Sequence, residues 1–181
     1  MGNTAKWGVA GVVAVALMLP LALSGQAQTP KDFHVADVEN LRSKFVAMAT
    51  AFPEDRYDWK PMEDTRSVRD VLVLVAAEVP ANWDLPAAEG AAKGYRAESV
   101  RVGNVAATKA LLITELNRSF DHLSRSLAGM SDSARAADGK TFGRDIKVDA
   151  GITLALSDMH EHLGQLIAYA RSNRIVPPWS R

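Results

Sequence analysis

The chain has 181 residues, which is enough for one domain with a substantial core and too few for two. Its 21 basic and 21 acidic residues are interspersed, so no clustered positive face for binding nucleic acid is expected. The absence of cysteine excludes disulfides, thiolate metal ligands and a cysteine nucleophile.

Residues 1–27 are predicted to be an export signal. Lys6 precedes a long apolar run over residues 7–23, and small residues suited to cleavage follow at 24–27. The alternative is an uncleaved membrane anchor, because the run is nearly long enough to cross a bilayer. Cleavage would remove only Lys6 among the charged residues, leaving 20 basic and 21 acidic residues in a mature domain of residues 28–181. The protein is therefore expected to be periplasmic or secreted, and to contact a membrane only through an uncleaved signal.

Two amphipathic helices are predicted in the first half of the mature chain. Apolar residues at steps of three and four indicate the first over residues 35–51, and Pro53 stops it. The second is predicted over residues 68–79, where Ser67 can cap the first free amides. The β-branched run at 71–75 also suits a strand, but a lone strand between helices would have no partner.

Two more helices are predicted in the second half. The third covers residues 105–129. The last runs from near Asp149, whose carboxylate is expected to cap it, to Arg171. The tail, residues 175–181, cannot be helical through the two consecutive prolines 177–178, and Trp179 is expected to fold back on the bundle. The core-facing stripe of the last helix consists of Ile152, Leu156, Met159, Leu163, Leu166 and Ala170.

Four such segments predict an all-α fold, an antiparallel four-helix bundle with long connecting loops. The longest connections are residues 80–104 and the polar stretch 130–148. In the first of these, Trp83 and Tyr95 are expected to cover an edge of the core or, alternatively, to line the mouth of a ligand site.

The last helix also carries the candidate functional residues. Asp158 and His162 are four residues apart and project from adjacent turns on one shoulder of the apolar stripe. A carboxylate and an imidazole together suit zinc or another divalent ion, with a partner helix supplying the remaining ligands. The alternative is an ordinary helix-stabilising pair. His160 lies on the other shoulder, so the three side chains cannot converge on one ion.

The stretch from Asp158 through Met-His-Glu-His-Leu-Gly-Gln, with the tail Pro177-Pro-Trp179, resembles the DinB-like family of four-helix bundles. In that family two histidines four apart, followed one residue later by Gly-Gln, mark two ligands of a three-histidine metal site. Here His162 stands at the second position and Asp158 at the first. The resemblance implies a divalent metal, zinc or nickel, a relation to metal-dependent thiol transferases and isomerases, and pairing into a homodimer.

The third ligand implied by the resemblance is missing. Alignment on Ser67-Val68 and Val71-Leu72 places it at Leu74, and leucine cannot bind a metal. Asp70 or Glu78, one turn away on the same helix, could replace it, and so could His122 of the third helix. The metal triad is therefore expected to be degenerate.

Two functions remain open at this point. In the first, the protein is a metal-dependent enzyme whose ion activates a thiol or a water. In the second, it is a non-catalytic exported bundle with a decayed metal site, which binds a small apolar ligand or a partner protein. A catalytic metal usually has three protein ligands, so the loss at Leu74 favours the second.

Overall fold

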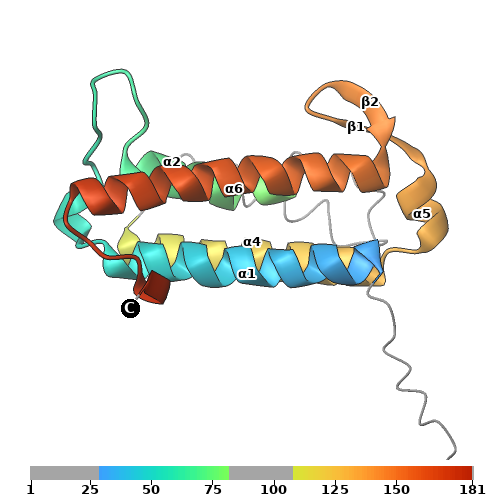
Figure 1. The fold of residues 1–181 in the computed structure, drawn as a ribbon, viewed down its shortest axis with the longest axis horizontal. Helices are drawn as coiled ribbons and strands as arrows, with labels where there is room; N and C mark the ends of the chain where they lie inside the picture. Colours follow the sequence, from blue (N-terminus) through green and yellow to red (C-terminus); the bar gives the residue numbers. More distant parts are fainter. Residues whose placement is uncertain (1–28, 82–107, 181) are drawn as a thin grey trace, which may run out of the picture.

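The computed structural model describes residues 29–81 and 108–180. The predicted signal, Trp83 and Tyr95 lie outside the described residues. Four long helices pack along a common axis, and a short helix and a β-hairpin lie at one end (Figure 1). In chain order the elements are α1 (Pro30–Ala51), η1 (Glu54–Arg56), α2 (Val68–Ala81), α4 (Lys109–Gly129), α5 (Asp132–Ala136), β1 (Asp138–Thr141), β2 (Arg144–Lys147), α6 (Val148–Ser172) and η2 (Pro178–Ser180).

The four long helices form the predicted bundle, in which α1 and α2 each contact both α4 and α6. Lys31 bonds to Met130 at one end, and Lys109 bonds to Phe52 at the other, so α1 and α4 are antiparallel. Helices α2 and α6 are also antiparallel, whereas α1 and α6 run in the same direction, as do α2 and α4 (Figure 1). Of the four pairs of helices in contact, α1 with α4 and α2 with α6 are therefore antiparallel, and α1 with α6 and α2 with α4 are parallel.

Local sequence signals explain where the helices begin. The first starts at Pro30, five residues earlier than predicted, because Thr29 and Asp32 form a reciprocal capping box. Ser67 caps α2 as predicted, since its hydroxyl accepts from the Asp70 amide at 3.1 Å. The β-branched run in α2 is helical, as predicted. No helix in the described residues is long and apolar enough to span a membrane.

The core lies along the centre of the bundle and is formed by the predicted stripes. Phe45 of α1 and Phe120 of α4 are fully buried and stack with their ring centroids 5.7 Å apart.

The tail folds back as predicted, because Trp179 lies against α1 with Lys44 Nζ 5.8 Å from the centroid of its ring. A short 3-10 turn begins only at Pro178, so no helix runs through both prolines, as predicted. Proline is tolerated there because the first residue of a helical turn needs no amide donor.

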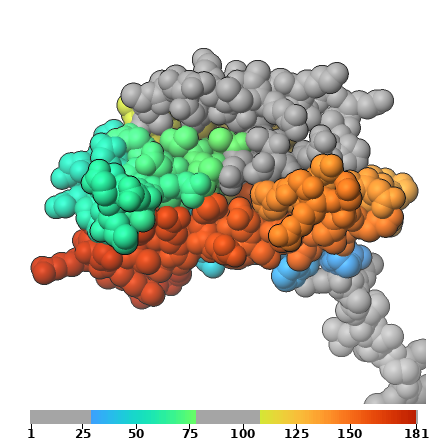
Figure 2. All heavy atoms as spheres, turned by 90° about the horizontal axis from the view of Figure 1, so that it is seen from above, coloured from blue at the N-terminus to red at the C-terminus, as the bar shows by residue number. Residues whose placement is uncertain are grey.

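The connector 130–148 contains structure that the sequence prediction missed. Helix α5 is followed by an antiparallel hairpin in which Asp138 pairs with Lys147 and Thr141 pairs with Arg144. The turn places Phe142 and Gly143 at φ 49° and 75°. This left-handed conformation suits glycine, but it is uncommon for a phenylalanine. The hairpin is packed at the start of α6, away from the loop that precedes α2 (Figure 2).

The contact of this hairpin with α6 requires a glycine. A Cβ added at Gly151 would overlap Thr141 Oγ1 and would lie 3.2 Å from Thr141 Cβ. We expect Gly151→Ala to lower the free energy of unfolding by about 0.5–2 kcal/mol, because the cost of shifting Thr141 and the hairpin exceeds the gain from replacing a helical glycine. The matched control is Gly164→Ala in the same helix, where an added Cβ meets nothing within 4 Å. It should raise the stability by about 0.5–1 kcal/mol. Urea unfolding measures both, and a stabilising Gly151→Ala would contradict this packing.

Candidate metal centre

Helix α6 places Asp158 and His162 on one shoulder, as their spacing predicts. Met159 and Leu163, beside them in the sequence, face the core. His162 Nε2 lies 3.5 Å from Asp158 Oδ2, and the two side chains are 15% and 36% exposed. The pair therefore lies at the edge of the core, where a carboxylate and an imidazole are partly shielded from water.

The separation of these two atoms suits a shared ion. Two ligands bound at roughly 2.0–2.2 Å in a tetrahedral arrangement lie about 3.4 Å apart. The 3.5 Å between Asp158 Oδ2 and His162 Nε2 is close to this value. The same distance also suits a simple ion pair, so the geometry fits both alternatives considered from the sequence.

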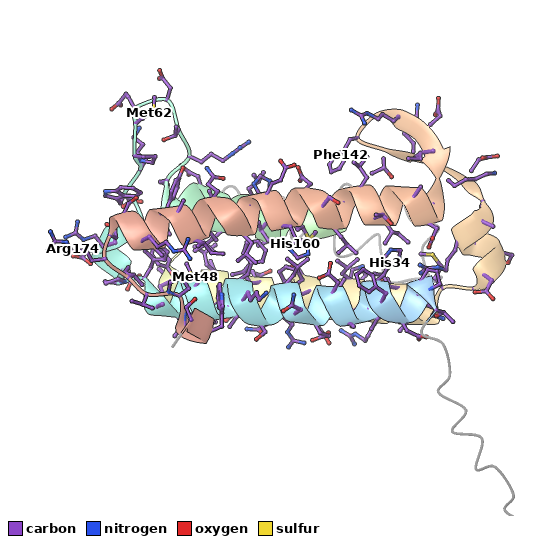
Figure 3. The ribbon with its side chains drawn as sticks, viewed as in Figure 1. His34, Met48, Met62, Phe142, His160 and Arg174 are labelled. Carbon is purple, nitrogen blue, oxygen red and sulfur yellow. The ribbon has the colours of Figure 1, made fainter. Side chains whose placement is uncertain are left out.

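His160 points to a different neighbour. Its Nε2 lies 2.9 and 3.1 Å from the two carboxylate oxygens of Asp37 on α1, and Figure 3 shows it between α1 and α6. Because successive residues are about 100° apart around a helix, Asp158 and His162 project from the side of α6 roughly opposite His160. The hydroxyl of Tyr169, two turns after His162, donates to the carbonyl of Arg66 just before α2. The structure therefore separates His160 from the pair, as predicted.

The described residues do not supply a third ligand. Leu74 is half-buried on α2, and Asp70 is used at the start of that helix, where its Oδ2 accepts from the Ser67 amide at 2.9 Å. The Glu78 side chain lies outside the described residues. Among the side chains that the structure describes, which leave out Glu78, no three from His, Cys, Asp or Glu are grouped to hold a metal ion.

His122, the alternative ligand from the third predicted helix, lies half-buried on α4. Burial lowers the pKa of its imidazole below the ordinary value, and the nearby Arg125 adds to this effect. Its backbone carbonyl accepts from the hydroxyl of Ser126 at 2.8 Å. Among the described residues, His122 does not form a group of three metal-ligating side chains with Asp158 and His162.

A second polar cluster, which the sequence analysis missed, lies at the end of the bundle. His34 of α1 is only 5% exposed and contacts Arg135 of α5 and Thr153 of α6. Asp149 was predicted to cap α6, but this was wrong: Lys147 is at the cap position, no side chain bonds there, and the Asp149 carboxylate pairs with Arg135. The one signal for His34 is that it continues the buried stripe of α1 one turn before Val38.

Comparison with known proteins gives a structural match. No protein-family model matches the sequence, and neither does any curated protein. The DinB-like protein YjoA of Bacillus subtilis is similar with a TM-score of 0.57 and 20% identity, over 77% of this chain and 90% of that one. A DinB-like protein of Bacillus cereus ATCC 10987 is similar with a TM-score of 0.63 and 12% identity, over 80% of this chain and 93% of that one. The chain therefore has the DinB-like fold that the resemblance of its last helix and tail implies.

Proposed function

We propose that this protein is an exported DinB-like bundle that binds a divalent cation, zinc or nickel, through Asp158 and His162. The observation that supports the proposal is the 3.5 Å separation between Asp158 Oδ2 and His162 Nε2. Binding should be weak, because one carboxylate and one imidazole donate less strongly than three imidazoles. Export rests on the sequence of residues 1–27, and a homodimer rests on the family resemblance.

Asp158 and His162 supply only two of the three protein ligands that a catalytic zinc site usually has. Catalytic zinc usually has three protein ligands and an open position, and Leu74 contributes no ligand where the resemblance calls for one. Asp158 and His162 alone therefore do not make a complete catalytic metal site. The relation to thiol transferases and isomerases would require a further ligand, and that ligand would have to come from outside the described residues.

A second candidate function is a non-catalytic exported bundle with a decayed metal site. The observation that favours it is Leu74, an apolar side chain at the implied ligand position on α2. Such a protein would bind a small apolar ligand or a partner protein instead of an ion. Whether the folded protein binds a divalent ion distinguishes the two candidates.

Metal titration during thermal melts makes this test. Zinc, nickel and manganese are added in turn to metal-stripped protein, and the melting temperature is recorded. An ion that binds only the folded state at a hundredfold excess over Kd should add roughly 2.7 kcal/mol of stability. His162→Ala should abolish the increment, because it removes one of the two donors.

His160→Ala is the matched control, since His160 lies two residues away on α6 and bonds to Asp37 instead. It should keep most of the metal-dependent increment. If no metal raises the melting temperature, or if both variants lose the increment equally, the decayed-site candidate is the better account.

A further inference from the structure

The short segment between α4 and α6 is attached to the bundle in an unusual way. We call residues 131–147, which comprise α5 and the hairpin, the end segment. Arg135 is the only buried residue of α5, and the residues of both strands are exposed or half-buried. A charged side chain therefore makes the deepest contact between α5 and the bundle. Burial of a charge is costly unless the charge is paired, so the partners of Arg135 contribute to how firmly the end segment is held, beside the packing of Thr141 against Gly151.

Those partners come from two other helices. Arg135 Nη2 lies 2.6 Å from His34 Nδ1 on α1, and it also pairs with the Asp149 carboxylate on α6. The neighbouring Nη1 is buried with no hydrogen-bond partner among the described residues. The anchor thus depends on the contacts of Nη2. Figure 3 shows His34 between α1 and α6, at the end of the bundle that carries the hairpin.

The contacts determine the protonation state of His34. A guanidinium can only donate, so His34 Nδ1 must accept and carries no proton. The hydroxyl of Thr153 donates to the Asp149 carbonyl at 3.2 Å, so it accepts from His34 Nε2 at 3.1 Å. The imidazole is therefore neutral, with its single proton on Nε2. This tautomer is required by its two neighbours.

A second proton would change this arrangement. It would occupy Nδ1, remove the acceptor for Arg135, and place two cations side by side in a buried position. The charged groups that act on His34 are Arg135 from α5, Asp149 from α6, and Asp37 from α1 itself. The nearer carboxylate, Asp149, lies 3.7 Å from His34 Nδ1 and is already paired with Arg135. Asp37 is hydrogen-bonded to His160.

We propose that His34 is a pH-sensitive latch, which holds the end segment on the bundle while it is neutral and releases it when it is protonated. Burial lowers the pKa of His34 below its ordinary value of 6.5, and this outweighs the opposing effect of Asp149. The closed state thus binds fewer protons than the open state. The latch is fully closed above the ordinary pKa and opens as the pH falls below it.

Hydrogen exchange of the purified protein, followed by mass spectrometry and corrected for intrinsic rates, tests the latch. Between about pH 7 and about pH 5, opening of residues 131–147 should increase relative to the centre of α4, because the open state takes up a proton on His34 over this range more readily than the closed state does. His34→Asn keeps an acceptor near the position of Nδ1 but cannot be protonated, so it should remove the pH response. Arg135→Met should leave the end segment open throughout the range.

His122→Gln is the control, because it removes the half-buried histidine of α4, whose pKa is also lowered, and should leave the response of the end segment intact. A response that persists unchanged in His34→Asn would overturn the proposal. If that variant does not fold, NMR titration of the wild-type protein still decides. The midpoint for the His34 ring should coincide with the midpoint for the amides of residues 131–147, and separate midpoints would refute the latch.

Discussion

Phe120→Ala is expected to lower the free energy of unfolding by about 3–5 kcal/mol, because it removes a buried aromatic ring and leaves a cavity. Phe120 is fully buried on α4 and stacks on Phe45 of α1, with an angle of 26° between the rings. The pair lies at the interface of two helices that are antiparallel along their whole length. The cavity would open between them, where neither helix can close it without losing its other contacts.

Urea unfolding of the variant measures this loss, and Phe33→Ala is the matched control. Phe33 is 62% exposed on α1, so its removal should change the stability by less than about 0.5 kcal/mol. A cycle with Phe45→Ala should give a coupling energy of about 0.5–1.5 kcal/mol, since the stacked rings interact directly. Equal losses from Phe120→Ala and Phe33→Ala would show that the core is not where the structure places it.

Periodicity predicts the helices of this protein because each helix buries one continuous stripe. The stripe of α6, which includes Ile152 and Leu163, is buried as expected. Boundaries depend on capping contacts instead, and α1 begins earlier than its stripe because of Thr29 and Asp32. The direction of each helix in the bundle is a property of the tertiary arrangement, and the periodicity of a single helix contains no information on it.

The hairpin was missed because it has no apolar alternation. Its strands read Asp-Gly-Lys-Thr and Arg-Asp-Ile-Lys, and their side chains are largely exposed. Its turn also breaks the usual preference, since Phe142 adopts a positive φ next to Gly143. The hairpin is instead specified by its contact with α6 at Gly151, which is a tertiary contact.

Sequence reasoning found the half of the candidate site that lies on one helix. Asp158 and His162 are on adjacent turns because helical geometry requires it. The latch, by contrast, joins His34 to Arg135 across 101 residues of sequence, and helical spacing cannot predict a contact of that kind. For the same reason the sequence could show that Leu74 is not a ligand, but it could not show which group, if any, takes its place.

The loop between α1 and α2 is held by a buried tyrosine whose hydroxyl donates to a backbone carbonyl of α1. Tyr57 is fully buried and donates to the Ala49 carbonyl at 2.7 Å. Burial raises its pKa from 10.0 to about 12, Glu54 adds to the rise, and Arg69 opposes it. Tyr57→Phe should therefore lower the stability near neutral pH by about 1–2 kcal/mol, because the Ala49 carbonyl loses its donor.

The same substitution should cost less stability in alkali than near neutral pH. The folded protein keeps the Tyr57 proton to a higher pH than the unfolded chain does, so wild-type stability is intact below pH 10.0 and is lost as the pH rises toward about 12. This loss is on the order of 2–3 kcal/mol and is absent from Tyr57→Phe, which has no proton to lose. Urea unfolding at about pH 8 and about pH 11 should show the gap between wild type and variant shrinking or reversing as the pH rises. Tyr169→Phe should keep the wild-type alkaline loss, because Tyr57 is still present. A gap of the same size at both pH values would mean that the Tyr57 hydroxyl is not buried against Ala49.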